Sequence, residues 1–350
     1  MTDLVRILLV GCGDIAVSQH LPALCRSPNA RAVAAVDPDD GRRALVAREY
    51  GVPTFATIDN AVRSVGIDAA IVATPPDVTS EVSQVALRLG LHVLCEKPMA
   101  VDLADGVQLH AAAMKSDRVV QVGFTNRFSP LVQRLRDAIV AGRLGSPLVF
   151  TLGAYDERYD ASNVTHLGRM NRFLTRAPAF VHEGAHLADY VAFLTGSWPT
   201  RVAASGRRTS PDLSGENFVA ANVDWANGDL ARLEVGWLFP ALPSGHFRVL
   251  GPHASAEIIR REGRLVFDDG VHREEHLLGE GWNPICFDRQ LAHFVGAIRG
   301  QVLPGPTTAD GLASLELGDA VVRSMRDHEV VEIAPGVAPK LRPMRRGGAG

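Results

Sequence analysis

The chain is short of cysteine and of net charge, and each shortage excludes a class of protein. Its 350 residues include four cysteines, at positions 12, 25, 95 and 286. They form no Cys-x-x-Cys pair and no disulfide-like framework, which favours a protein of the reducing cytoplasm. The formal net charge of −3 indicates neither a nucleic acid nor an anionic membrane surface as partner.

Long apolar runs are also missing. No stretch approaches the roughly 20 residues that a membrane-spanning helix needs, and the apolar residues 4–10 are too few for a signal peptide with its cleavage site. We therefore expect a cytoplasmic protein with no membrane partner. Its length suffices for two domains, which we place at residues 1–122 and 123–335. The remaining residues, 336–350, are rich in Gly, Pro and Arg and predict a disordered tail.

The first third of the chain alternates short apolar runs with helical stretches. Continuous apolar runs of this length are typical of strands that are buried on both faces of a parallel sheet. Strands are expected at residues 5–10, 32–36, 53–55, 68–73 and 91–95, with helices at 41–50, 58–65 and 78–89. Repeated units of this kind predict a doubly wound α/β Rossmann domain with right-handed crossovers.

A glycine-rich turn follows the first of these strands and opens a helical stretch that runs to about residue 26. Its sequence is Gly11-Cys12-Gly13-Asp14-Ile15-Ala16. In a dinucleotide-binding motif the first glycine permits the tight turn, and the second lets backbone approach a pyrophosphate. The helix N-terminus adds N–H donors. We therefore expect cofactor contacts from Gly11, Gly13, Asp14 and Ile15.

Asp37 ends the second predicted strand and bears on the choice of cofactor. An acid at this place accepts hydrogen bonds from the ribose hydroxyls, which favours NAD. Arg42 and Arg43 lie close by in the sequence and could instead hold the 2′-phosphate of NADP. We predict NAD, with NADP as the alternative.

Two later strands also end in residues that suit a ligand site, because ligands of such sheets bind at the carboxyl ends of the strands. Thr74 and Pro75 follow the fourth strand, and Glu96 and Lys97 follow the fifth. All four are predicted cofactor contacts. Lys97 could also donate a hydrogen bond to a substrate hydroxyl, although a surface Glu–Lys pair is the plainer interpretation. A cis bond at Pro98 would aim the lysine inward.

The second half has a different pattern, which predicts an α+β domain. Its expected large, mainly antiparallel open sheet has helices on one face. Helices are expected at 131–141, 181–195, 287–299 and 311–326, and a long polar loop at 156–180. Strands are expected at 146–154, 201–208, 217–225, 230–237, 246–250, 255–260 and 264–267.

The densest group of titratable residues lies in the helix expected after that loop. His182, His186 and Asp189 fall at i, i+4 and i+7 and so share one helix face. The two histidines together with Glu183 match the His-Glu-x-x-His pattern of zinc hydrolases. No third ligand motif follows at a recognisable spacing, and Gly184 weakens the helix centre. We therefore expect no metal, and an acid/base histidine for a redox site is the other interpretation.

Several short motifs occur together in an order that resembles one family. They are Gly11-x-Gly13-x-x-Ala16, His20-Leu21-Pro22-Ala23-Leu24, Asp37-Pro38, Ala73-Thr74-Pro75-Pro76, Glu96-Lys97-Pro98 and the segment 123–130. The chain resembles the glucose–fructose oxidoreductase / inositol dehydrogenase / rhizopine-catabolism (Gfo/Idh/MocA) family. The resemblance rests on motifs over residues 4–200 and on pattern alone beyond them.

The resemblance implies hydride transfer between a nicotinamide and a secondary alcohol of a sugar, cyclitol or related polyol. His186 would exchange a proton with the substrate hydroxyl, and Lys97 would position and polarise the same oxygen. Asp189 would orient the imidazole or bind substrate. Further candidate substrate contacts are Asn126, Tyr155 and Arg172. The resemblance also implies a homodimer or homotetramer formed through the second domain's sheet.

One departure from the family pattern concerns His182, which stands where relatives usually carry an aspartate. Either Glu183 or Asp189 supplies the missing charge, or His182 and His186 are a catalytic pair that shares one proton. The departure also keeps open a regulator that binds the cofactor but has lost catalysis. A zinc hydrolase is the remote alternative.

Overall fold

The computed structural model describes residues 4–279 and 282–334, which form two compact units. The first unit holds residues 4–128 and 283–312, and the second holds 129–279, 282 and 313–334. The predicted boundary after residue 122 gives two contiguous domains, whereas the chain here returns to its first unit for residues 283–312. The predicted tail, residues 336–350, lies outside the described residues.

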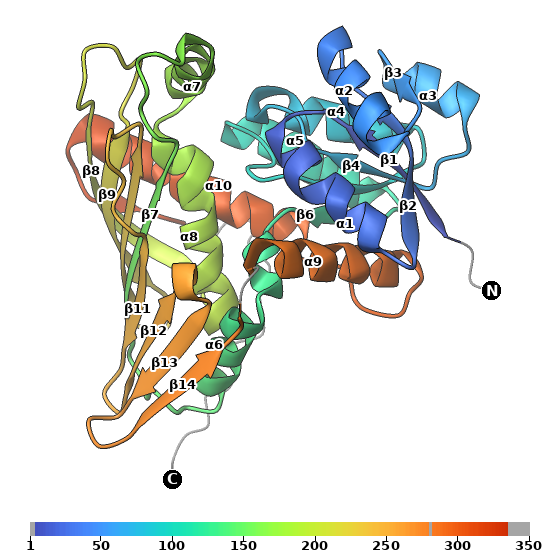
Figure 1. Cartoon of the computed structure of the whole chain (residues 1–350). Coiled ribbons are helices and arrows are strands. Elements are labelled where there is room, and N and C mark those ends of the chain that lie inside the picture. Colours follow the sequence, from blue (N-terminus) through green and yellow to red (C-terminus); the bar gives the residue numbers. More distant parts are fainter. Residues whose placement is uncertain (1–3, 280–281, 335–350) are drawn as a thin grey trace. The chain divides into compact units, whose positions relative to one another are not determined.

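The predicted parallel sheet of the first unit is confirmed (Figure 1), and it has a sixth strand, β6, that was not predicted, in the order β3-β2-β1-β4-β5-β6. Its strands are β1 (Val5–Val10), β2 (Ala30–Val36), β3 (Thr54–Phe55), β4 (Ala69–Val72), β5 (His92–Cys95) and β6 (Val120–Val122). Its helices are the π-helix η1 (Ala16–His20), α1 (Leu21–Arg26), α2 (Asp40–Tyr50), α3 (Ile58–Ser64), α4 (Pro76–Arg88), α5 (Leu103–Lys115), the 3₁₀ turn η2 (Thr125–Phe128) and α9 (Trp282–Ile298).

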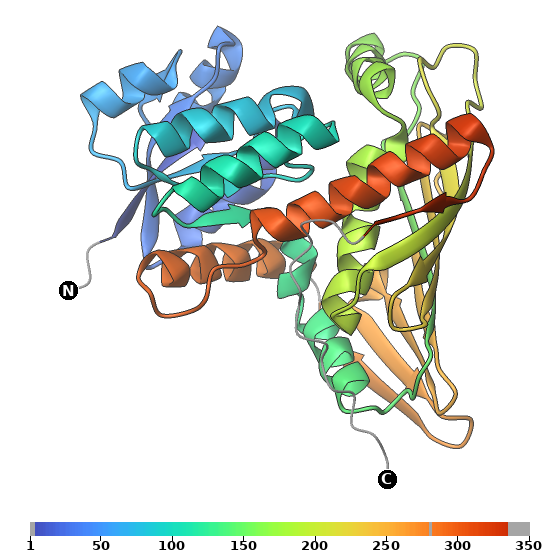
Figure 2. The same ribbon diagram turned by 180° about the vertical axis from the view of Figure 1, so that it is seen from behind.

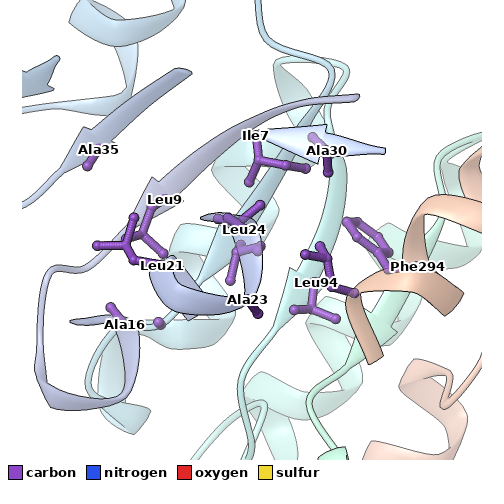
Figure 3. Close-up of a cluster of buried hydrophobic side chains, with 14 of the residues drawn as sticks. Ile7, Leu9, Ala16, Leu21, Ala23, Leu24, Ala30, Ala35, Leu94 and Phe294 are labelled. Atoms are coloured by element: carbon purple, nitrogen blue, oxygen red, sulfur yellow. The ribbon is translucent and has the colours of Figure 1, made fainter. Parts of the chain in front are cut away.

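Small side chains hold helix α1 close to this sheet. Alanines at 16, 23, 30 and 35 are almost fully buried and pack with the leucines of β1 and α1 in one core. Figure 3 shows these side chains meeting between the strands and α1, with Phe294 of α9 entering the same core. Close packing of this kind fixes the turn after β1, where the glycine motif lies.

The order of the strands decides where a ligand can bind. The chain leaves β1 toward β2 on one side and reaches β4 on the other side by a later crossover. Loops diverge at such a switch point, and ligands of open parallel sheets bind there, which is beyond the carboxyl ends of β1 and β4 in this fold. The sequence places Gly11 and Thr74 at these two ends.

The second unit is built on a nine-stranded sheet of order β14-β13-β12-β11-β7-β10-β9-β8-β15. Its strands are β7 (Val149–Asp156), β8 (Pro199–Arg207), β9 (Phe218–Trp225), β10 (Leu230–Trp237), β11 (His246–Leu250), β12 (Ser255–Ile259), β13 (Arg264–Asp268), β14 (Arg273–Leu277) and β15 (Val331–Glu332). Its helices are α6 (Pro130–Val140), α7 (Val164–Arg176), α8 (Ala179–Thr195), the short turn η3 (Arg260–Glu262) and α10 (Thr308–Asp327), which belongs to this unit from residue 313 on.

The predicted open, mainly antiparallel sheet is confirmed, with one parallel pair, β7 with β10. Helix α8 packs on the face formed by β7, β9 and β10 and is also packed against α6. In Figures 1 and 2 no helix of the described chain lies along the sheet's other face.

The expected loop at 156–180 is wrong, because its second half forms helix α7. The Asn163 side chain caps this helix by accepting a hydrogen bond from the backbone N–H of His166. Met170 and Leu174 are its only buried residues. Two apolar positions among polar neighbours are too few to show the period of an amphipathic helix in the sequence. No described helix is both long and apolar enough to cross a membrane.

Candidate functional site

The turn after β1 requires glycine at position 11 for reasons internal to the fold. Gly11 has φ +92°, and a Cβ built there would lie 2.4 Å from the carbonyl oxygen of Ala73. Its N–H donates to the carbonyl of Val36 at 2.8 Å. The turn is therefore held between the ends of β2 and β4, and the structure brings Gly11 against the turn that carries Thr74.

Gly13 has no such internal requirement. Among the described residues no heavy atom lies within 4 Å of a Cβ built on Gly13. The space that a side chain would fill is open, as a motif needs if backbone is to approach a pyrophosphate. Asp14 and Ile15, the other predicted contacts in this turn, are both exposed. The residues present therefore fit a bound dinucleotide.

Asp37 is held rigidly beside this turn. It is 4% exposed, and its Oδ2 accepts the N–H of Cys12 at 2.8 Å while Oδ1 accepts the N–H of Asp39 at 2.9 Å. Burial, reinforced by the charge of Asp37, raises the pKa of the Cys12 thiol to about 12. The thiol is therefore neutral at physiological pH.

The two nearby arginines differ in how they are held. Arg43 donates to the backbone carbonyl of Asp37 at 2.6 Å and also pairs with Asp40. Arg42 is about half exposed and lies 3.9 Å from Oδ2 of Asp37. Of the two cations, Arg42 is the less engaged and is the one that could meet a 2′-phosphate.

The turns after β4 and β5 are each fixed by a buried polar side chain. Thr79 is 1% exposed, and its hydroxyl donates to the carbonyl of Pro75 at 3.0 Å and lies 3.0 Å from Oγ1 of Thr74. Glu96 is 9% exposed and contacts Nε2 of His20 at 2.7 Å. The Lys97–Pro98 peptide bond is cis, a form that the sequence left open.

Asn126 lies on η2 in the same unit and is 5% exposed. Its neighbour Arg127 pairs with Asp310 at 2.8 Å, and both side chains are largely buried. Burial alone would raise the pKa of Asp310, but Arg127 and hydrogen bonds from Thr307 outweigh it and lower that pKa. This ion pair fixes the segment that carries Asn126.

In the second unit the predicted histidine cluster lies on helix α8. His182 is 3% exposed, and its ring stacks on Trp237 with centroids 5.3 Å apart and packs against Phe173 at 5.7 Å. Its Nε2 lies 3.3 Å from the carbonyl oxygen of Phe173. A carbonyl can only accept, so Nε2 of His182 is the donor.

His186 and Asp189 follow His182 on the same face of α8 because the helix is continuous through them. His186 is half-buried, whereas Asp189 is 4% exposed. Gly184, between the two histidines, makes room for a ring, since a Cβ there would lie 2.8 Å from Phe180. The predicted sharing of one helix face by two histidines and a carboxylate is thus realised in the fold.

The zinc pattern is not matched by a ligand set. Nε2 of His182 is engaged with the backbone of α7, and nowhere in residues 4–279 and 282–334 do three or more His, Cys, Asp or Glu side chains form a group that could hold a metal ion.

Two predicted substrate residues lie apart from this cluster. Tyr155 packs over Gly236 and beside His246, whereas His182 stacks on the next residue, Trp237. Successive strand residues point to opposite faces, so Tyr155 lies on the face of the sheet away from α8. Arg172 is exposed on α7, adjacent to the Phe173 that contacts His182.

Sequence reasoning assigned no role to three residues that this geometry singles out. His20 was quoted only as part of a motif, although it contacts Glu96. Phe173 and Trp237 enclose His182. Glu96 is distant from His20 in the sequence, and Phe173 and Trp237 lie on other elements than His182. Of the three residues, only His20 could have been found from the sequence, through its place in one of the ordered motifs.

Comparison with known proteins places both units in one family. Residues 5–124 match the family described as "Oxidoreductase family, NAD-binding Rossmann fold". Residues 136–333 match "Oxidoreductase family, C-terminal alpha/beta domain".

Similar proteins cover nearly the same length. "Rhizopine catabolism protein MocA" of Rhizobium meliloti is 28% identical over 90% of this chain and 93% of its own. "Inositol 2-dehydrogenase" of Leifsonia xyli subsp. xyli is 27% identical over 95% and 97%. "1,5-Anhydro-D-fructose reductase" of Ensifer adhaerens is 27% identical over 94% and 98%.

Solved structures share the fold. The aldose–aldose oxidoreductase of Caulobacter crescentus complexed with glycerol has a TM-score of 0.82 at 23% identity, covering 94% of this chain and 100% of its own. A putative myo-inositol dehydrogenase from Sinorhizobium meliloti 1021 has a TM-score of 0.80 at 24% identity, covering 94% and 100%. Since both family matches together span most of the sequence, the chain belongs to the Gfo/Idh/MocA family of NAD-binding oxidoreductases.

Proposed function

We propose that this oxidoreductase catalyses the reversible oxidation of a secondary alcohol in a sugar, cyclitol or related polyol. The observation that carries the proposal is the turn after β5. It presents Lys97 at the same edge of the sheet that carries the Gly11–Ile15 turn and Asp37, which suit a dinucleotide. The names of the relatives, an inositol dehydrogenase and a sugar reductase among them, support this class of substrate.

We propose NAD rather than NADP as the preferred cofactor. The Asp37 carboxylate lies buried at the end of β2, where it can accept from ribose hydroxyls and would repel a 2′-phosphate. Arg43 is already engaged by the backbone of Asp37 and by Asp40, which leaves only Arg42 to offset that repulsion.

The chemistry divides between two side chains of this chain. Bound NAD supplies the hydride acceptor. The Lys97 ammonium donates a hydrogen bond to the substrate oxygen and stabilises the negative charge that develops on it, while His186 takes the hydroxyl proton. We assign the proton transfer to His186 because it is half-buried, whereas His182 is 3% exposed, is packed between two rings and donates through Nε2 to Phe173.

In this proposal His182, which stands where relatives usually carry an aspartate, has a packing role. His182 links α7, α8 and β10 through one hydrogen bond and two ring contacts. Asp189 or Glu183, each within one turn of His186, then supplies the carboxylate that orients the imidazole. Asn126 and Arg172 are the proposed further substrate contacts.

We also propose that a second copy of the chain covers the bare face of the nine-stranded sheet. An open sheet needs its second face covered or polar. This face carries cross-strand ion pairs such as Arg248–Glu257 at 2.8 Å and Arg201–Asp224 at 2.7 Å, and charges of both signs allow self-association about a two-fold axis. Light scattering would then give a dimer or a tetramer.

The experiment measures formation of reduced nicotinamide by absorbance, with NAD or NADP and a panel of inositols, aldoses and amino sugars. Lys97→Ala is expected to lower turnover about 10²–10⁴-fold while NAD binding is retained. Lys115→Ala, which removes an exposed lysine at the end of α5, is the matched control. Full turnover by Lys97→Ala would remove the assignment.

The second candidate is a regulator that binds NAD without turning over substrate. The observation that favours it is His182, whose ring packs against Phe173 and Trp237. This residue stands where relatives usually carry an aspartate. The two candidates separate on one result, because the regulator binds NAD but reduces none across the whole panel.

A further inference from the structure

A buried pair of titratable side chains, His20 and Glu96, connects η1 to the turn that carries Lys97. Nε2 of His20 lies 2.7 Å from Oε1 of Glu96, and the two residues are 3% and 9% exposed. The His20 ring also packs edge-on against Phe287, with centroids 5.0 Å apart. A carboxylate this far from water requires a hydrogen-bonded partner, and His20 is that partner on Oε1.

The second oxygen of the same carboxylate reaches Lys97 itself. Oε2 of Glu96 accepts the backbone N–H of Lys97 at 3.2 Å. A Cβ at Gly123 would lie 2.7 Å from this oxygen, so the glycine at the end of β6 leaves the room that the carboxylate occupies. One carboxylate therefore joins the His20 ring to the main chain from which the Lys97 side chain departs.

His20 is the last residue of η1, which starts directly after the Gly11–Ile15 turn. The N–H of Leu21 donates to the carbonyl of Ala16, five residues back, which is the π-type pattern. Turns of this type are rare and occur frequently at functional sites. The hydroxyl of Tyr50 donates to the carbonyl of Val17 at 2.8 Å and fastens the same turn from α2.

We propose that His20 is a positioning residue for Lys97. Its N–H fixes the Glu96 carboxylate, which in turn fixes the main chain of Lys97, so that the lysine is held in register with the dinucleotide turn that precedes η1. The inference rests on the proposed function for its catalytic consequence, but the hydrogen bonds that carry it do not depend on the substrate.

The test compares two amides at position 20. In His20→Gln the side-chain nitrogen reaches about as far as Nε2 and can still donate to Glu96, whereas in His20→Asn it falls short by one methylene. Misplacement of a catalytic group by about 1 Å lowers rates about 10²-fold. His20→Asn is therefore expected to lose kcat on that order with little change in the dissociation constant of NAD, and His20→Gln to recover most of it. Lys115→Ala, which removes an exposed lysine at the end of α5, should keep the wild-type kcat.

A second measurement does not require turnover. Hydrogen exchange of the Lys97 amide, followed by NMR of the full chain with NAD, should quicken at least about tenfold in His20→Asn and stay near wild type in His20→Gln and Lys115→Ala. An unchanged Lys97 amide in His20→Asn would overturn the inference, as would equal kcat values for the Asn and Gln variants. If the wild-type chain oxidises none of the panel, the proposed function fails while the exchange result still decides the role of His20.

Discussion

The two glycines of the dinucleotide turn should respond in opposite ways to the same substitution. Gly11 has φ +92°, and its Cβ would lie 2.4 Å from a backbone carbonyl oxygen, whereas a Cβ on Gly13 meets no described atom within 4 Å. Gly11→Ala should therefore lower stability. Gly13→Ala should leave stability unchanged and weaken NAD binding, because its methyl group occupies space that the pyrophosphate needs.

The magnitudes follow from these geometries. Left-handed backbone costs an L-residue about 1–2 kcal/mol, and a forced contact in a packed region adds about 1–3 kcal/mol. For a unit of this size, each 1 kcal/mol lowers Tm by about 2–4 °C, so Gly11→Ala should melt roughly 4–20 °C lower. Losing one hydrogen bond to a charged pyrophosphate, about 1.5–3 kcal/mol, weakens NAD binding by Gly13→Ala roughly 10- to 10²-fold.

Thermal scans with and without NAD measure both effects, because a ligand that binds only the folded state stabilises it by RT ln(1 + [L]/Kd) and so raises Tm more when it binds more tightly. Wild type and Gly13→Ala should share one Tm without NAD, and only wild type should rise strongly when NAD is added. An equal NAD-induced rise in Gly13→Ala would refute the cofactor argument. A wild-type Tm for Gly11→Ala would refute the steric one.

Three further predictions concern charge and reactivity. The folded-state pKa of Asp310 is lowered, so the Arg127 pair stabilises the fold above the unfolded carboxyl value of about 3.9, and that stability is lost as pH falls through the folded value. In urea unfolding, Asp310→Asn should cost about 3–5 kcal/mol at pH 7, and a gap that does not shrink at acid pH would contradict the assignment. Burial raises the pKa of Cys12 and Cys95 to about 12, so an alkylating reagent near pH 8 should label exposed Cys25 well before either, as mass spectrometry of peptides would show. Asp37→Ser should improve NADP binding at least about tenfold relative to NAD, and an unchanged ratio by calorimetry would remove Asp37 from cofactor choice.

The sequence predicted the strands whose carboxyl ends carry the proposed site. Gly11, Asp37 and Lys97 each follow a strand whose continuous apolar run was readable, and a parallel sheet brings such ends to one edge. Helix α7 was missed because two buried side chains, Met170 and Leu174, are too few to show a helical period. Strand β14 was missed because its residues, REEHL, carry charged side chains on both faces of the strand and do not alternate with apolar ones.

Contacts between segments that are distant in the sequence could not be predicted from hydrophobic periodicity or short motifs. His20 and Glu96 are 76 residues apart in the sequence, and the residues around each of them do not indicate that the two side chains pair. The return of residues 283–312 to the first unit is of the same kind, because an amphipathic helix such as α9 shows which face is buried but not against what. His182 illustrates a third limit, since no residue near it in the sequence indicates that the rings of Phe173 and Trp237 pack around it.

The central claim is that Lys97 and His186 act on the same substrate oxygen, and a double-mutant comparison tests it most directly. Reduced-nicotinamide formation would be measured for Lys97→Ala, His186→Ala and the double variant, each shown to bind NAD as wild type does. Residues that act as a unit are strongly non-additive. The account therefore predicts that each single change removes most of the turnover and that the second adds little. Losses that multiply, or a single variant with wild-type turnover, would contradict it.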